Sequence, residues 1–361
     1  MSAPRIEKLP DAPPSAQAIE LASSVLRQGG VLALPTESVY GLCTRADLPA
    51  GLARVIALTD RPADLPFTWV IGKPSDLQRF PQVSRMVERV VAKYWPGPLT
   101  LELPGVPKGL EAIQSDGWTR VRLPAHQGTR GILAAQEFPL VLASTTSRGS
   151  ASFVSAEAVL EGVRGPLDLV FDGGPARLPE EASVLRLGKG RFELVRPGLF
   201  TIEQLRKVAG LRIALVCTGN TCRSPMAEGL ARALLEKALQ TDDIAEFGFE
   251  VRSMGVAASV GDSASRHAVS VLREAGIEFS GHRARAVQSE NLARFERIYC
   301  MTRSHRAALL STLPPQRQLS VELLDPEGRD VPDPIGGSLD DYRHTAVAIE
   351  RALKKRLEEW L

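Results

Sequence analysis

The sequence has few cysteines, little net charge and no long apolar run. Its four cysteines among 361 residues lack the spacing of a small disulfide scaffold, which excludes a disulfide-rich secreted domain and favours a reducing compartment. The net charge of +2 gives no general affinity for polyanions. No stretch approaches the roughly 20 apolar residues that a membrane-spanning helix needs. The five histidines and four cysteines show no ligand spacing, so no metal site is expected. These absences predict a cytoplasmic protein without a membrane partner.

One segment carries strong chemistry, residues 212–230, with the sequence RIALVCTGNTCRSPMAEGL. Residues 213–216 are typical of a buried parallel strand, and a helical pattern begins at Ser224. Backbone N–H groups at a helix start lack partners and lie at the positive end of the helix dipole. The loop between strand and helix therefore favours an oxyanion, and it favours the thiolate form of Cys217. Arg223 offers a planar fork for two phosphate oxygens. The segment predicts a site that binds and attacks a phosphoryl group.

A phosphoenzyme cycle also needs an acid that protonates the leaving atom and later activates water. The best candidate is Asp333 in the segment DVPDPIGGSLDDY, on a loop ahead of a helix expected from Leu339 onward. Alone, an Asp-Pro-Gly sequence is most often a turn, and a cysteine in an apolar context is most often a core residue. In the loop itself, Gly219 lets the backbone approach a ligand, Asn220 tolerates a left-handed conformation, and Ser224 can donate to the sulfur.

From about Leu211 to Leu361 the chain resembles the low-molecular-weight protein tyrosine phosphatases, with CTGNTCRSPMAE as the phosphate loop and DPIGGSLDDY as the acid loop. The resemblance implies a doubly wound, four-stranded parallel sheet and no cofactor. It also implies that Cys217 is the nucleophile, Arg223 the transition-state clamp and Asp333 the general acid and base. The supporting positions that it implies are Thr218, Gly219, Asn220, Thr221, Cys222, Ser224, Ser253 and His282. Taken alone, the Ser253 hydroxyl is more typical of a strand end and the His282 imidazole of a surface.

Thr221 bears on the choice of phosphorylated protein substrate. Within the resemblance, members that act on phosphotyrosine usually carry a branched aliphatic residue at this position, and members that cleave phosphoarginine carry Thr. Ile335, however, stands where arginine phosphatases tend to have Phe and eukaryotic tyrosine enzymes Tyr. One pocket residue usually shifts discrimination by roughly 1 kcal/mol. Phosphoarginine is therefore slightly preferred, and phosphotyrosine stays open.

The remaining cysteines have simpler interpretations. Cys222 either forms a reversible disulfide with Cys217, which would protect the thiolate from irreversible oxidation, or is a small buried side chain at the helix start. Cys43 and Cys300 lie in apolar, strand-like contexts and are predicted core residues.

The preceding part of the chain is long enough for a second domain. Residues 1–14 are polar and Pro-rich, and we expect a disordered lead-in rather than a signal peptide. Residues 15–207 then form a domain, with a boundary between Lys207 and Leu211. Helices are predicted over residues 16–27 and 52–58. Strands are predicted at VLALP, FTWVIG, LTLEL, TRVRLP, PLVLAS, LDLVFDGG and SVLRLGKGRFELVRPG. Many strands with few helices favour an α+β fold.

The segment PTESVYGL, residues 35–42, follows one of these strands and alone would be a polar turn. Together with WPGPLT, RVRLPAH, PLVLAS and RPG, in this order, it makes residues 15–206 resemble the YrdC-like threonylcarbamoyl-AMP synthases. The resemblance implies ATP, which Mg²⁺ can accompany, threonine and bicarbonate as substrates, and the tRNA-modification machinery as a partner. The positions that it assigns to threonine, nucleotide and phosphates are Thr36, Arg61, Arg122, Ser144 and Arg196.

Two motifs depart from that family. Thr59 replaces the lysine of a Lys-x-Arg-Pro motif, and Thr146 replaces the asparagine of a Ser-Ala-Asn motif. Each loss can remove roughly 3 kcal/mol of stabilisation if the group contacts charge in the transition state. Three hypotheses therefore stay open: an active synthase, a non-catalytic module that binds a nucleotide or RNA and regulates the phosphatase, or a scaffold in which both sites are inert. Basic residues form no clear stripe, so a tRNA contact follows from the resemblance alone.

Overall fold

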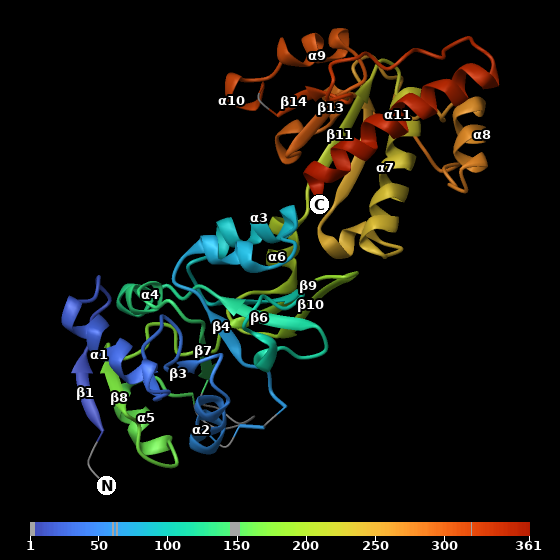
Figure 1. The fold of residues 1–361 in the computed structure, drawn as a ribbon. Coiled ribbons are helices and arrows are strands. Elements are labelled where there is room, and N and C mark those ends of the chain that lie inside the picture. The colour runs from blue at the N-terminus through green and yellow to red at the C-terminus, as the bar shows by residue number, and fades with distance from the viewer. Residues whose placement is uncertain (1–3, 60, 63, 145–151, 319) are drawn as a thin grey trace. The chain divides into compact units, whose positions relative to one another are not determined.

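The computed structural model describes residues 4–59, 61–62, 64–144, 152–318 and 320–361. Two compact units make up the chain, Met1–Leu205 and Arg206–Leu361 (Figure 1). The division falls within helix α6 (Ile202–Ala209), just before the predicted boundary. Within the described ranges, every helix is either too short or too polar to traverse a lipid bilayer.

The first unit is built on a ten-stranded mixed sheet in the order β1-β8-β2-β3-β7-β4-β6-β5-β9-β10. Its strands are β1 (Arg5–Lys8), β2 (Leu32–Leu34), β3 (Gly41–Arg45), β4 (Thr68–Val70), β5 (Leu99–Pro104), β6 (Trp118–Arg122), β7 (Leu140–Ser144), β8 (Leu169–Asp172), β9 (Ser183–Gly188) and β10 (Arg191–Arg196). Its helices are α1 (Ala16–Arg27), α2 (Pro49–Thr59), α3 (Arg85–Tyr94), α4 (Gln127–Ala134) and α5 (Ala156–Gly162), with short 3₁₀ turns at Pro74–Arg79 and Glu111–Ile113. The α+β fold predicted from the strand-rich pattern is confirmed.

The expected disordered lead-in is wrong for residues 5–8, because they form β1, which pairs in parallel with β8. The segment gives no apolar signal because it is an edge strand with largely exposed side chains, held through its backbone. The helix predicted over residues 16–27 is confirmed. Ser15 caps it, since the Ser15 hydroxyl accepts from the Ala18 N–H at 3.1 Å.

The core of this unit lies where α1 and α4 cover strands β2, β7 and β8. Leu26 and Ile132 from the helices pack with Leu34 and Phe171 from the strands. Cys43 of β3 is fully buried in the same cluster, so its assignment to the core is confirmed. Burial raises the pKa of this thiol well above its usual range, as an inert core cysteine requires.

The second unit has a four-stranded, all-parallel sheet in the order β12-β11-β13-β14, which confirms the predicted sheet. Its strands are β11 (Arg212–Cys217), β12 (Glu250–Gly255), β13 (Arg297–Cys300) and β14 (Val321–Leu323). Its helices are α7 (Arg223–Leu239), α8 (Arg266–Glu274), α9 (Arg303–Leu310), α10 (Pro315–Gln318) and α11 (Leu339–Trp360). Short 3₁₀ turns lie at Ile244–Phe247, Val287–Ser289 and Leu292–Arg294.

Helices α7, α8 and α11 pack on one another, whereas α9 contacts β13 and β14 (Figure 1). Val216 of β11 and Cys300 of β13 are fully buried in the sheet core beside Phe295. The final helix begins at Leu339 as predicted, with Ser338 as its N-cap in a capping box. In this topology the carboxyl end of the central strand β11 meets the start of α7, which is where parallel α/β sheets bind ligands.

Candidate active sites

The loop between β11 and α7 surrounds the sulfur of Cys217. This side chain is only 3% exposed. The Asn220 N–H donates to Sγ at 3.2 Å, and the Ser224 hydroxyl lies 2.9 Å from Sγ. Cys222 is the N-cap of α7 and makes no side-chain capping bond. The first N–H groups of the helix therefore need an acceptor, which an oxyanion can supply.

Asn220 fixes the shape of this loop. Its φ of 56° is left-handed, as the sequence predicted. Its carboxamide donates to the Ser224 hydroxyl at 2.9 Å and accepts from the Arg285 N–H at 2.7 Å. The ring N–H of His282 donates to the Asn220 carbonyl at 2.8 Å. Burial lowers the pKa of His282, although that hydrogen bond opposes part of the shift. A neutral, buried imidazole thus supports the loop.

Ser253 of β12 is connected to the loop indirectly, through Glu228 and Arg285. Its hydroxyl and its N–H both donate to Glu228 of α7, at 2.5 and 2.8 Å. Arg285 lies 3.8 Å from the same carboxylate and donates its backbone N–H to Asn220. Ser253 therefore ties β12 to α7, and Arg285 connects that tie to the loop. The resemblance gave the residue, but its partner Glu228 could not be identified before the strand and helix were placed.

Arg223 and Asp333 meet although 110 residues separate them. Arg223, 6% exposed, donates to Asp333 Oδ2 at 2.5 Å and to Thr218 Oγ1 at 3.4 Å. Its other terminal nitrogen donates to the Val331 carbonyl at 3.5 Å. The Asp333 side chain is 42% exposed and lies on the loop before α11. The structure thus brings the sulfur loop, a guanidinium and a partly exposed carboxylate to one place.

Sequence reasoning missed His305 at the start of α9. Its Nε2 lies 2.8 Å from Thr218 Oγ1, and its Nδ1 lies 2.8 Å from Thr302 Oγ1. Burial lowers the pKa of His305, and the nearby charge of Arg223 lowers it further. Nothing in MTRSHRAAL distinguishes this imidazole from an ordinary residue of a helix start. Its relation to Thr218 exists only once β13 lies beside β11.

Cys222 also has a neighbour that the sequence did not predict. This is Tyr342 of α11, whose hydroxyl lies 3.1 Å from the Cys222 sulfur. Burial and the contact with Cys222 both raise the pKa of Tyr342. Cys217 and Cys222 are both free thiols. The Thr221 hydroxyl lies 3.7 Å from Cys222 Sγ, and a Cβ on Gly219 would lie 3.6 Å from that hydroxyl. Gly219, Thr221 and Cys222 therefore stand together on one side of the loop.

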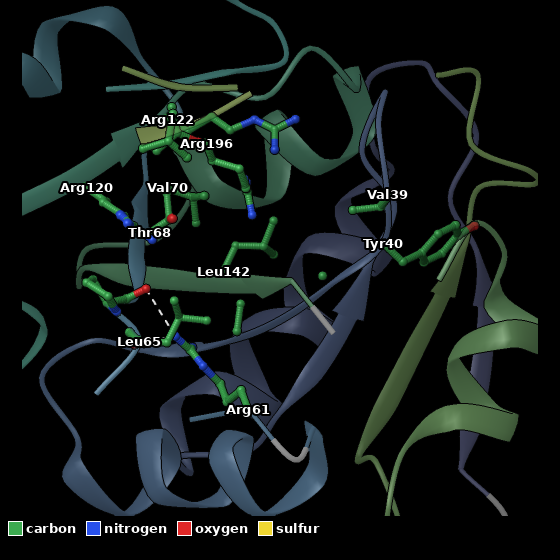
Figure 2. Close-up of a pocket in the computed structure, with 15 residues that line it drawn as sticks. Val39, Tyr40, Arg61, Leu65, Thr68, Val70, Arg120, Arg122, Leu142 and Arg196 are labelled. Atoms are coloured by element: carbon green, nitrogen blue, oxygen red, sulfur yellow. Dashed lines mark hydrogen bonds between the residues drawn. The ribbon is translucent and has the colours of Figure 1, made fainter. Parts of the chain in front are cut away.

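The first unit contains a pocket into which four arginines point: Arg61, Arg120, Arg122 and Arg196 (Figure 2). Arg61, 5% exposed, donates to the carbonyls of Leu65 and Pro66 at 2.5 and 3.1 Å. Its Nε and Nη1 have no hydrogen-bond partner within the described part of the chain. Burial lowers the pKa of Arg61 to about 10, with a further contribution from Arg120. An anion in this pocket would satisfy the free N–H groups.

The other lining arginines are tied to carboxylates. Arg122 donates to Glu37 at 2.6 Å and to Ser38 at 2.9 Å. Burial pushes the pKa of Glu37 upward, but the pairing with Arg122 outweighs it and the pKa is lowered. Arg196 pairs with Glu181, and burial lowers the pKa of Arg196. The sequence identified three of the four arginines that line the pocket and missed Arg120.

Thr36 lies beside the pocket rather than among the described residues that line it. The buried Thr36 hydroxyl donates to the Val39 carbonyl at 2.7 Å and accepts from the Ser38 N–H at 3.1 Å. Thr36 thus closes the turn that carries Val39 and Tyr40 to the pocket. Ser144 ends β7 opposite Gly41. Thr146 lies outside the described residues. Within those residues, no group of three His, Cys, Asp or Glu side chains is placed to hold a metal ion.

Two families of known proteins match the two parts of the chain. The family model described as low molecular weight phosphotyrosine protein phosphatase matches residues 212–360. The protein-arginine-phosphatase of Geobacillus stearothermophilus is 35% identical over 151 residues, which cover 41% of this chain and 95% of that protein. The chain belongs to this phosphatase family. Its second unit is a phosphatase domain.

The first part carries a Sua5–YciO–YrdC domain, since the family model described as telomere recombination matches residues 24–198. The threonylcarbamoyl-AMP synthase of Pyrococcus abyssi is 32% identical over 221 residues, which cover 59% of this chain and 63% of that protein. The chain thus spans under two thirds of that synthase. Among solved structures, the arginine phosphatase YwlE of Geobacillus stearothermophilus shares 35% identity, with a TM-score of 0.36 over 41% of this chain and 91% of that one.

Proposed function

We propose that the C-terminal domain hydrolyses a phosphorylated protein side chain through a cysteinyl-phosphate on Cys217. The observation that carries this proposal is the position of the sulfur. It accepts from the Asn220 N–H, lies 2.9 Å from the Ser224 hydroxyl and sits at the start of α7. These contacts place the nucleophilic sulfur where the start of the helix favours a bound oxyanion.

In the first step the sulfur attacks phosphorus in line, and the bond from phosphorus to the leaving nitrogen or oxygen breaks. The substrate phosphate replaces Asp333 on the Arg223 guanidinium. The released carboxylate takes up a proton from water, and the resulting carboxyl group gives that proton to the leaving atom. The helix N–H groups and Arg223 stabilise the charge on the equatorial oxygens. In the second step Asp333 takes a proton from water, the water oxygen attacks phosphorus, and the S–P bond breaks. Inorganic phosphate leaves the site, and the Cys217 thiolate is regenerated.

Phosphoarginine is the substrate that we prefer over phosphotyrosine. Two relatives support it, the protein-arginine-phosphatases of Geobacillus stearothermophilus and Bacillus subtilis, at 35% and 34% identity. Thr221 supports it as well, because its hydroxyl and methyl stand on the loop beside Gly219 and can seat a guanidinium. The exposed Ile335, 73% accessible, gives the acid loop no aromatic wall for either substrate.

The test is hydrolysis of matched phosphoarginine and phosphotyrosine peptides by the full chain and by Thr221→Ile. We expect the wild-type chain to favour phosphoarginine by roughly 10-fold in kcat/KM, and Thr221→Ile to lose most of that preference. Equal kcat/KM values on both peptides would refute the arginine assignment. Hydrolysis of p-nitrophenyl phosphate that survives in Cys217→Ser would refute the cysteinyl-phosphate mechanism.

For the N-terminal domain we propose that threonine, bicarbonate and ATP react to give threonylcarbamoyl-AMP, pyrophosphate and water, for use in tRNA modification. The four arginines of the pocket support this, because a triphosphate needs several cations around it. Any Mg²⁺ would be held chiefly by the phosphates themselves. Pyrophosphate release that requires threonine as well as ATP would support the synthase. Binding of ATP without turnover would support the regulatory module instead.

A further inference from the structure

The pocket of the first unit holds positive charge that its own carboxylates do not neutralise (Figure 2). Arg122 pairs with Glu37, and Arg196 pairs with Glu181. Arg61 has no carboxylate partner within the described residues. The buried Glu102, the partner of Arg120, is shared with Arg186. Like charges held close together in a partly buried site favour an anion between them.

Arg120 lies close to the other arginines that line this pocket. It lies on β6 two residues before Arg122, so the two side chains project from the same face of the sheet. Its charge lowers the pKa of both Arg61 and Arg196 after the effect of burial, which places it close to both. Its Nε donates to Glu102 at 3.1 Å, and its two terminal nitrogens have no partner among the described residues. Figure 2 shows Arg120 and Arg61 reaching the same space from β6 and from the segment after α2.

Thr59 supplies no cation to this pocket. Its hydroxyl donates to the Val55 carbonyl at 2.8 Å within α2 and is buried there. Thr59 is also absent from the lining of the pocket. The charge that the resemblance to the synthases predicts from a lysine at this position must therefore come from elsewhere if the pocket is to hold a triphosphate.

We propose that Arg120 is a phosphate ligand of this pocket and, together with Arg61, holds the triphosphate of the nucleotide. Arg120 supplies from β6 the positive charge that Thr59 lacks. Its free terminal nitrogens offer the planar fork that binds two phosphate oxygens. Glu102 holds the Nε side of the guanidinium and leaves that fork directed into the pocket. The inference rests on the proposed synthase function for the identity of the nucleotide, but not for the presence of an anion site.

The experiment is isothermal titration of the full chain with ATP and, separately, with inorganic tripolyphosphate. Arg120→Ala should weaken the affinity for both ligands by about 10- to 100-fold, because one charge-assisted contact is lost. Arg120→Lys keeps the charge but loses the fork, and should lie between wild type and Arg120→Ala. The matched control is Arg186→Ala, which removes the other partner of Glu102 but no lining residue. It should stay within about 2-fold of wild type. Thermal unfolding establishes that each variant is folded.

Two outcomes overturn the inference. Affinities of Arg120→Ala within about 2-fold of wild type would show that Arg120 touches no phosphate. An equal loss in Arg186→Ala would show that the ion pairs of Glu102, rather than a ligand contact, decide the affinity. Failure of the synthase proposal looks different: the wild-type chain binds ATP, the arginine variants behave as expected, and no pyrophosphate is released with threonine and bicarbonate.

Discussion

Replacing Asn220 separates backbone strain from hydrogen bonding in the phosphate loop. At its φ of 56°, alanine is strained by about 1–2 kcal/mol, whereas glycine is not. Both replacements remove the hydrogen bonds to Ser224 and from Arg285. Each unpaired buried group costs about 1–3 kcal/mol. Glycine also gives the unfolded chain more entropy, by about 0.4–1 kcal/mol. We therefore expect Asn220→Gly to lower the free energy of unfolding by about 3 kcal/mol and Asn220→Ala by about 4 kcal/mol.

The assay must report on the second unit alone. Trp360 is the only tryptophan after Trp118 in the sequence and is fully buried. Urea unfolding followed by the ¹⁹F resonance of 5-fluorotryptophan at Trp360 gives that free energy directly. A control is Asn291→Ala, which removes an exposed cap of a 3₁₀ turn away from the loop. If both Asn220 variants lose under about 1 kcal/mol, the carboxamide network is not the one described. If Asn220→Ala is no less stable than Asn220→Gly, the left-handed backbone at residue 220 does not strain an alanine as described.

Three further outcomes follow from the site. Arg223→Lys keeps the charge but loses the fork, so kcat for p-nitrophenyl phosphate should fall about 10²- to 10³-fold with a smaller change in KM; an unchanged kcat would contradict the clamp. His305→Ala removes the imidazole that holds the Thr218 hydroxyl, so kcat should fall about 10-fold, whereas the exposed control His344→Ala should match wild type. Because the pKa values of His282 and His305 lie below their ordinary 6.5 in the fold, the unfolded chain binds more protons in that range. The stability that these two neutral imidazoles contribute to the second unit is fully present above pH 6.5. It is lost as the pH falls through their pKa values in the folded state. Urea midpoints measured across this range should show the fall, and His282→Gln should make it shallower; a flat profile would contradict the burial of neutral imidazoles.

Local patterns predicted the elements that carry a local signal. The helix over residues 16–27 has a serine cap and an apolar stripe, and the helix from Leu339 has a capping box. Strand β1 has no such signal, because its pairing with β8 depends on a segment more than 160 residues away. Strand β3 was indicated only by the strand-like context of Cys43, because its alternation is hidden: four of its five residues are buried.

The candidate sites also divide into residues with a local sequence signal and residues whose partners lie far away in the sequence. Cys217 and Arg223 are six residues apart on one loop, so spacing alone placed them together. Asp333 was proposed from its position on a loop ahead of a helix and supported by the resemblance, and the structure supplies its contact with Arg223. His305, Tyr342 and Arg120 were missed because their partners come from other strands and helices. For such residues the chemistry is visible only after the sheet order is known.

The central claim is that the Cys217 sulfur captures a phosphoryl group from another molecule. The direct measurement is trapping of the adduct: the full chain is mixed with a ³²P-labelled phosphoarginine peptide, quenched, digested and mapped by mass spectrometry. Asp333→Asn should slow hydrolysis of the intermediate and raise its yield. Label is expected on Cys217 in the wild-type chain, more label in Asp333→Asn, and none in Cys217→Ala. Turnover of the peptide without label on residue 217 would rule out a cysteinyl-phosphate on this sulfur.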